Sequence, residues 1–153
     1  VIRYLTLLSL LTLIFIDQYT KAIALDWLVF KHVVIIPDFV SFALAFNKGV
    51  AFSLFANQHD FYIIGITVIN FIAIIGLMYW LLSKKHSIFI SLGLSLIIAG
   101  GSSNLIDRVK LHYVVDFIQL SFYDYQLFIC NLADIYVTIG AVLFIYSRIF
   151  EQS

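Results

Sequence analysis

Four long apolar stretches constrain this chain more than any other feature of its sequence. They cover residues about 2–24, 61–82, 88–106 and 127–150. A helix needs about 20 predominantly apolar residues to cross a bilayer, and each stretch is close to that length. The single proline, Pro37, falls in none of them, so no spanning helix should be interrupted. The sequence predicts an all-α integral membrane protein with four transmembrane helices in a single membrane domain, residues 1–153.

The composition excludes several other classes of protein. The chain is 63% hydrophobic and 12% charged, whereas a soluble domain is about half apolar and about one quarter charged. Its formal net charge is zero, which gives no basic field for nucleic acid. The lone cysteine, Cys130, excludes an intrachain disulfide and a multi-cysteine metal site, and the histidines show no metal-ligand spacing. We expect no metal, no cofactor and no nucleic-acid partner.

The segment of residues about 26–59 has no stretch long enough to span a membrane. Residues 40–46 alternate between large and small side chains, and Asn47-Lys48-Gly49 then leads into a second apolar run, residues 50–55. Two such runs around a short Asn/Gly turn are typical of a β-hairpin. We expect a small sheet on the bilayer surface after the first helix. Residues 107–126 mix charges with aromatics, so we expect an interfacial segment there.

The short basic loop around Lys84 and Lys85 predicts the orientation. Short loops rich in lysine and arginine face the cytoplasm, which places both chain ends on that side and the sheet on the other. A raw count opposes this, with five basic residues outside and four inside. The short loop has more weight, because Lys31 and Lys48 lie in a longer insert where the rule is weaker.

Two carboxylates in apolar surroundings form the candidate catalytic site. Asp116 lies among valines, phenylalanine and isoleucine, and Asp134 lies inside the last apolar stretch, about 10 Å along its helix at 1.5 Å per residue. An acid at membrane depth is costly and indicates a functional site. Two acids that meet would share one proton, as in aspartic proteases. We therefore expect a peptide bond to be cut at a membrane surface.

Other polar residues converge on the same leaflet, and each leaves an alternative open. Asn131 is three residues before Asp134; its amide could orient the carboxylate or simply join two helices. Asn104, Asp107 and Arg108 share a helical face, and the arginine could bind a substrate carbonyl, a lipid head group or an aspartate. The i,i+4 pair Asp17 and Lys21, the turn residues Asn47 and Gly49, and the small residues 99–103 suit structural roles.

Two functions of other classes compete with a peptidase. A small transporter or proton-relay protein would also carry intramembrane acids, but it usually shows an internal repeat or helices broken near the midplane. This chain shows no repeat, and its polar residues gather at one interface. A lipid-binding module would use Arg108 and the sheet, and would leave the two acids without a purpose.

Five motifs together resemble the bacterial lipoprotein signal peptidases, the type II signal peptidase family. They occur in the family's order and extend over most of the chain: Asp17–Lys21, Phe46–Ser53, Gly100–Arg108, Val114–Phe117 and Asn131–Asp134. Two positions depart from the usual pattern, with Ser103 in place of glycine and Cys130 in place of phenylalanine. Ser103 affects the expected helix packing, and Cys130 changes the bulk beside the site.

The resemblance implies an activity and assigns roles to residues. Asp116 and Asp134 correspond to the family's catalytic pair. The matching residues that line the site are Asn47, Asn104, Arg108 and Asn131, and those with supporting roles are Asp17, Lys21, Gly49 and Asp107. The expected substrate is a prolipoprotein whose lipobox cysteine already carries diacylglycerol, cut just before that cysteine at the outer face of the bacterial inner membrane. An extracytoplasmic β-cradle over the site, membrane lipid as a partner, and a monomer are also expected.

Overall fold

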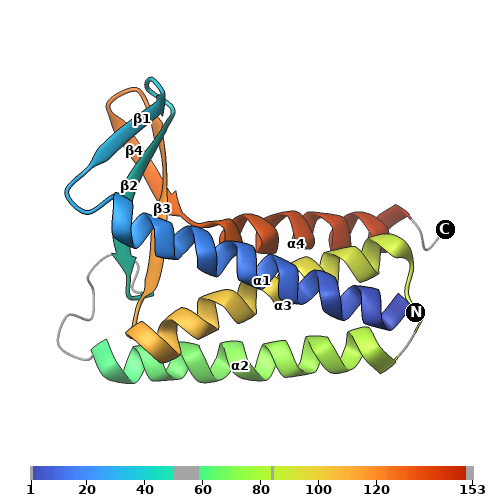
Figure 1. The fold of residues 1–153 in the computed structure, drawn as a ribbon. Coiled ribbons are helices and arrows are strands. Elements are labelled where there is room, and N and C mark those ends of the chain that lie inside the picture. Colours follow the sequence, from blue (N-terminus) through green and yellow to red (C-terminus); the bar gives the residue numbers. More distant parts are fainter. Residues whose placement is uncertain (1, 50–58, 84, 151–153) are drawn as a thin grey trace.

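The computed structural model describes residues 2–49, 59–83 and 85–150. Its elements are α1 (Ile2–Trp27), β1 (His32–Ile36), β2 (Val40–Asn47), α2 (His59–Ser83), α3 (Ile88–Leu111), β3 (Val114–Phe122), β4 (Tyr125–Cys130) and α4 (Leu132–Phe150). The helices form a bundle, and the strands form a sheet that stands at one end of it (Figure 1). The beginning of α1 and the end of α4 lie at the opposite end of the bundle.

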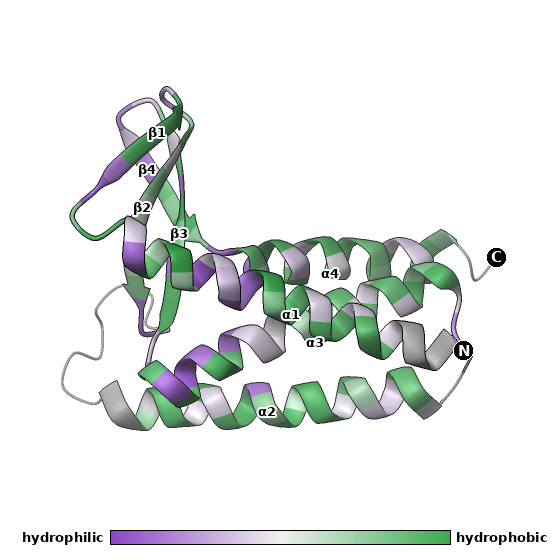
Figure 2. Ribbon diagram, in the orientation of Figure 1, coloured by the Kyte–Doolittle hydropathy of each residue, from purple (hydrophilic) through white to green (hydrophobic). Residues whose placement is uncertain are grey.

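Four helices in the described part of the chain are long and apolar enough to cross a membrane: Thr6–Trp27, Ile63–Ser83, Ile88–Leu111 and Leu132–Phe150. This confirms the prediction of four long apolar helices. Hydrophilic residues concentrate on the parts of α1 and α3 nearest to the sheet, whereas α2 is apolar along most of its length (Figure 2). The polar residues therefore gather at one end of an otherwise apolar bundle.

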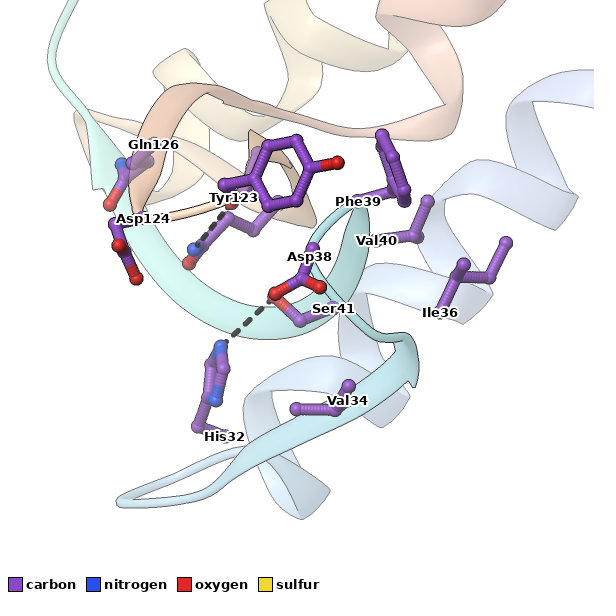
Figure 3. A pocket seen from close by; sticks show the side chains of 12 residues that line it. His32, Val34, Ile36, Asp38, Phe39, Val40, Ser41, Tyr123, Asp124 and Gln126 are labelled. Carbon is purple, nitrogen blue, oxygen red and sulfur yellow. Dashed lines mark hydrogen bonds between the residues drawn. The ribbon is translucent and has the colours of Figure 1, made fainter.

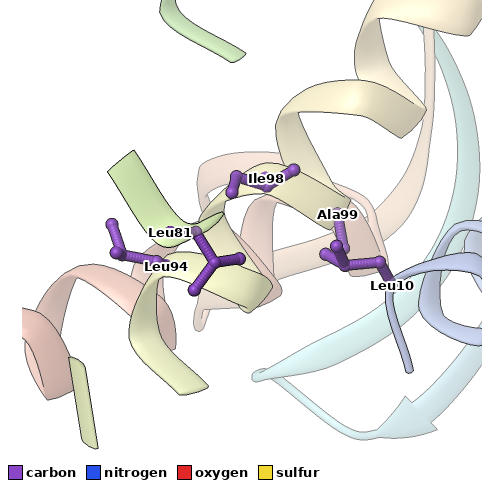
Figure 4. Close-up of a cluster of buried hydrophobic side chains, with 5 residues drawn as sticks. All are labelled: Leu10, Leu81, Leu94, Ile98 and Ala99. Carbon is purple, nitrogen blue, oxygen red and sulfur yellow. The ribbon is translucent and has the colours of Figure 1, made fainter. Parts of the chain in front are cut away.

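The helix α3 lies at the centre of the bundle. It contributes Leu94, Ile98 and Ala99 to a buried cluster that Leu10 of α1 and Leu81 of α2 complete (Figure 4). Glycines let α4 approach α3 closely. A Cβ atom on Gly93 would lie 2.8 Å from the Gly140 carbonyl oxygen, and one on Gly140 would lie 2.6 Å from the Gly93 oxygen.

The small-residue run makes a similar contact nearer to the sheet. A Cβ atom on Gly100 would collide with the carbonyl oxygen of Ala133, so the first turn of α4 is held directly against α3. This contact agrees with the packing role predicted for the run. It also fixes the position of the residue that follows Ala133, which is Asp134.

The sheet is antiparallel, with strand order β1-β2-β3-β4. The prediction of a sheet after the first helix is correct in part, because β3 comes from the segment predicted to be interfacial and β4 extends from that segment into the predicted last helix. The predicted second hairpin strand, residues 50–55, lies outside the described residues. Instead, β2 pairs with β1 across the turn at residues 37–39 and with β3, where Ala45 faces Asp116. Periodicity within one segment carries no information about such long-range pairing.

The helix boundaries also differ from the prediction. The last helix begins at Leu132 rather than near residue 127, because residues 127–130 belong to β4. A continuous apolar run does not show where a strand ends and a helix begins. The third helix continues to Leu111 and ends at His112, whose backbone is left-handed with a φ of 63°. That end turns the chain into β3 and carries Asp116 back towards the bundle.

Candidate active site

The structure brings the two predicted acids together around one buried asparagine. Asp116 comes from β3 and is 2% exposed, and Asp134 lies in the first turn of α4. Asn131, fully buried, donates from its side-chain nitrogen to Asp116 Oδ1 at 2.6 Å and from its backbone nitrogen to Asp134 Oδ2 at 3.2 Å. Asp134 thus lies at the beginning of the last helix, and the prediction that it lies about 10 Å along that helix is wrong.

Asn131 orients Asp134 as the cap of α4. Its Oδ1 accepts a hydrogen bond from the Asp134 backbone nitrogen at 3.0 Å, while the carboxylate of Asp134 accepts from the Asn131 backbone nitrogen. This reciprocal arrangement is a capping box. The spacing of three residues therefore does orient the carboxylate, which was one of the two alternatives the sequence left open.

Asn47 holds the second oxygen of Asp116. Its Nδ2 donates to Asp116 Oδ2 at 3.0 Å, and its Oδ1 accepts from the backbone nitrogen of Gly49 at 2.8 Å. Gly49 has a φ of 76°, a left-handed conformation that glycine adopts without strain. The turn predicted at Asn47 and Gly49 thus fixes which way the amide faces.

Asn104 plays the corresponding part for Asp134. Its Nδ2 donates to Asp134 Oδ1 at 2.9 Å, and its Oδ1 accepts from Lys21 Nζ at 2.9 Å and from Asn131 Nδ2 at 3.3 Å. An ammonium group only donates, so Lys21 fixes which atom of the Asn104 amide faces the carboxylate. Each of the four carboxylate oxygens of Asp116 and Asp134 now accepts an N–H.

A buried ion cluster lies behind the asparagines. Lys21 Nζ is 2.7 Å from Asp17 Oδ2 and 2.8 Å from Asp107 Oδ2, and all three side chains are at most 4% exposed. The sequence predicted a structural pair of Asp17 and Lys21 at the interface; the structure buries it and adds Asp107. A buried charge is tolerated only when it is paired and hydrogen-bonded.

The two acids of this cluster each fix the backbone beside one candidate catalytic acid. Asp107 Oδ2 accepts from the backbone nitrogen of Val115 at 3.2 Å, and Asp17 Oδ1 accepts from the backbone nitrogen of Ala133 at 2.8 Å. Val115 immediately precedes Asp116, and Ala133 immediately precedes Asp134. The ion cluster therefore fixes the backbone positions from which the side chains of Asp116 and Asp134 extend.

Two members of this network had no polar role in the sequence analysis. Gln18 Nε2 donates to Asp107 Oδ1 at 2.7 Å and to Ser103 Oγ at 3.0 Å. Ser103 Oγ donates to Asp17 Oδ2 at 2.6 Å, so the serine that departs from the family pattern adds a hydrogen bond to the buried cluster. A polar amide in an apolar helix is the signal that could have identified Gln18.

The surroundings of Asp116 favour its protonated form. Burial, with a further contribution from the charge of Asp134, raises the pKa of Asp116 to about 6, against the opposing effects of its hydrogen bonds and of Lys21. Burial also raises the pKa of Cys130 to about 11, with the nearby aspartates adding to the effect. Cys130 therefore remains a neutral thiol at physiological pH, as expected for an inert buried cysteine.

Arg108 lies beside the acids without an ion pair to them among the described residues. Its guanidinium donates to the carbonyl oxygen of Asn104 at 3.4 Å and interacts electrostatically with Asp134, Asp107 and Asp116. Asp124, another acid close to Asp116 in the sequence, is exposed at the β3–β4 turn. In the ranges that the structure describes, no three His, Cys, Asp or Glu side chains group as metal ligands.

The fold and the site define a multi-pass membrane protein with a paired-carboxylate centre at one end of its bundle. A family model described as Signal peptidase (SPase) II matches residues 9–150. The chain is 38% identical to a lipoprotein signal peptidase of Coxiella burnetii over 92% of this chain and 86% of that protein. It is 40% identical to one of Streptococcus thermophilus, over 90% and 87% of the two chains.

Solved structures agree with the sequence comparisons. A bacterial membrane enzyme solved by the in meso method at 2.3 Å resolution superposes with a TM-score of 0.81 and 30% identity, covering 97% of this chain and 89% of that one. A second, at 1.9 Å resolution, gives 0.81 and 28%, with 95% and 92% covered. The chain belongs to the signal peptidase II family, peptidases that cleave signal peptides from prolipoproteins. This confirms the resemblance carried by the five motifs.

Proposed function

We propose that the chain is an aspartic endopeptidase that removes signal peptides from diacylglyceryl-modified prolipoproteins and cuts just before the lipid-bearing cysteine. The observation that carries this proposal is the pair Asp116 and Asp134, bridged by Asn131, which donates from its side chain to Asp116 and from its backbone to Asp134. Both ion pairs in the described part of the chain belong to Lys21 and its two acids. The bridged pair is therefore held by amides and remains able to exchange protons.

The reaction begins with one proton on the pair. Asp116 carries it, in keeping with a pKa of about 6, and Asp134 is ionised. Asp134 takes a proton from a water molecule, and the oxygen of that water molecule attacks the scissile carbonyl carbon. At the same time Asp116 gives its proton to the carbonyl oxygen. A gem-diol forms. General acid–base transfer of this kind contributes about 10²–10⁴-fold to the rate.

Collapse of the gem-diol restores the pair. Asp134 gives its proton to the leaving nitrogen of the lipidated cysteine, the C–N bond breaks, and a hydroxyl proton of the gem-diol returns to Asp116. The net reaction consumes one water molecule and leaves the pair singly protonated. The same cycle can then repeat without a redox step or a further reactant.

The neighbouring residues keep the pair in the geometry that this cycle needs. Asn47, Asn104 and Asn131 orient the carboxylates, and Arg108 is placed to bind a substrate carbonyl and stabilise developing charge. Because every carboxylate oxygen of the pair already accepts an N–H, a cation would have to compete with these donors, which supports a metal-independent reaction. One copy of the chain supplies all of these groups, which supports a monomer as the active form.

The orientation in the membrane follows from the position of the site. The sheet lies at one end of the bundle, and the end of α2 and the beginning of α3, which the basic loop joins, lie at the other (Figure 1). The pair belongs to the end with the sheet, because Asp116 is in β3 and Asp134 is in the first turn of α4. A cytoplasmic location for this basic loop would place both chain ends inside and the site at the extracytoplasmic face, with the sheet as a cradle over it. A lipid-anchored substrate would reach the site from that leaflet.

Cleavage of a diacylglyceryl-modified lipobox peptide by purified protein in detergent tests the proposal. Wild type should cleave it in the presence of a chelator, and Asp116→Asn and Asp134→Asn should not. Asp124→Asn is the matched control, because it removes an exposed acid of the same sheet, and it should cleave at the wild-type rate. Substantial cleavage by both site variants would contradict the proposal, and ion flux in liposomes without cleavage would favour a transporter.

A further inference from the structure

A cavity of about 370 Å³ lies between the last turns of α1 and the sheet. The helix contributes Ile23, Trp27 and Leu28 to its lining, and the sheet contributes Val33, Ile35 and Phe42. Thr20 is the one polar residue in the described lining, and its hydroxyl donates to the Asp17 carbonyl oxygen at 2.8 Å. The cavity therefore suits an apolar ligand, and the lining includes neither aspartate of the pair nor the asparagines that hold it.

The position along α1 places this cavity at the boundary of the bilayer. The spanning part of α1, Thr6–Trp27, has 22 residues, about 33 Å at 1.5 Å per residue, which is close to the thickness of the hydrocarbon core. Trp27 thus lies at an interface, where tryptophan is enriched. Thr20 lies about 10 Å deeper, so the cavity extends from the head-group level into the acyl region.

The loop above the cavity carries a cation and an apolar side chain. Lys31 Nζ is 5.7 Å from the centre of the Trp27 ring, within the range of a cation–π contact. Phe30 is left-handed, with a φ of 59°, and its side chain is fully exposed. An exposed phenylalanine beside a lysine and a tryptophan is typical of a segment that lies among lipid head groups.

We propose that this cavity binds one acyl chain of an anionic membrane phospholipid, one whose head group has a net negative charge, with its phosphate at Lys31. The charge at the rim selects a phospholipid over the lipid of the proposed substrate, because a diacylglyceryl group carries no phosphate. The bound chain would fill the space between α1 and the sheet beside Phe117, the residue after Asp116. This inference concerns a resident lipid and does not depend on the proposed cleavage.

Strand β1 provides a matched pair of variants. Ile35 and Ile36 are 50% and 51% exposed. Ile35 lines the apolar cavity, whereas Ile36 lines a separate pocket with His32, Asp38 and Ser41 (Figure 3). Substitution of either by glutamine adds the same polar group to the same strand, but only Ile35→Gln places it in the proposed lipid site.

Quenching of Trp27 by brominated lipid tests the proposal. In a Trp80→Phe background, Trp27 is the sole tryptophan, and phosphatidylglycerol with brominated acyl chains is titrated into detergent-solubilised protein. In this background, quenching should saturate at a low mole fraction of brominated lipid. The mole fraction needed for saturation should be about tenfold higher when Ile35→Gln is added, and unchanged when Ile36→Gln is added. Lys31→Gln should remove a preference of about fivefold over brominated phosphatidylcholine, as expected for one interfacial lysine.

Three results would overturn the proposal. Quenching that rises in proportion to mole fraction without saturation would mean bulk contact with the micelle. Equal losses in Ile35→Gln and Ile36→Gln would mean that strand damage, not the cavity, causes the effect. Displacement of the brominated lipid by a diacylglyceryl-modified peptide, with no effect of Lys31→Gln, would assign the cavity to the substrate's own lipid. The Asp116→Asn variant should keep the lipid signal, which separates this site from catalysis.

Discussion

Two pairs of acids lie close together in this protein, three of the four acids buried and Asp134 half-buried, and the partners of the two pairs differ in kind. Asp17 and Asp107 both contact Lys21 at less than 3 Å, so each negative charge has a cation beside it. Asp116 and Asp134 accept hydrogen bonds from amides, and for Asp116 burial raises the pKa to about 6. A cation and N–H donors both favour the charged form of a carboxylate, but at Asp116 the effect of burial outweighs that of the amide donors.

Loss of an acid from the amide-held pair should have the largest effect, and only on the rate. We expect Asp116→Asn to lower kcat/KM by about 10⁴-fold, the upper range for a group in general acid–base catalysis. Its stability should stay the same or increase at pH 7.5, because burial disfavours the charged form that is removed. Lipobox-peptide cleavage and thermal unfolding in detergent measure the two effects. A folded variant with more than one tenth of the wild-type rate would contradict the assignment.

Loss of the Lys21 cation should act mainly on stability, by lowering the free energy of unfolding. Lys21→Met leaves Asp17 and Asp107 buried without a positive partner, which costs about 3–5 kcal/mol in buried pairs of this kind. The free energy of unfolding can be measured in mixed detergent by tryptophan fluorescence. Lys31→Met, at an exposed position, is the control and should change it by less than about 0.5 kcal/mol. Equal effects in the two variants would remove the distinction between the two acid pairs.

Loss of the Ser103 hydroxyl tests the ion cluster of Lys21, Asp17 and Asp107 with a smaller change. Ser103→Ala removes a hydrogen bond to Asp17 and an acceptor for Gln18. Hydrogen bonds to charged groups contribute about 1.5–3 kcal/mol, so the variant should lose stability in that range while the KM for peptide changes little. Ser102→Ala is the neighbouring control. A fall in kcat without a loss of stability would show that Ser103 acts on the reaction itself.

The smallest expected effect is a shift in pH dependence. The proposed cycle needs Asp116 protonated, so kcat/KM should fall as the pH rises through about 6. Asn47→Leu removes a hydrogen bond that stabilises the ionised form; the pKa of Asp116 should rise, and the alkaline limb should move up by roughly one unit. A downward shift, or none, in a well-folded variant would contradict the role given to Asn47.

The sequence was most informative where neighbouring residues determine the structure. The four spans follow from local hydropathy, and the asparagine three residues before Asp134 does cap its helix. The origin of half of the sheet was missed, because β3 joins the sheet by pairing with β2, about 70 residues earlier in the chain, and β4 is added to it only through β3. The bonds of Gln18 to Asp107 and Ser103 were missed for the same reason, since they join helices that are far apart in sequence.

The most direct test is an infrared titration of the aspartate carboxyl groups in detergent-solubilised protein labelled with ¹³C-aspartate. One buried carboxylic acid should titrate near pH 6, and its signal should be absent from Asp116→Asn and retained in Asp124→Asn. A buried acid that persists in Asp116→Asn, or that disappears only when Asp17 or Asp107 is replaced, would contradict the distinction between the two pairs.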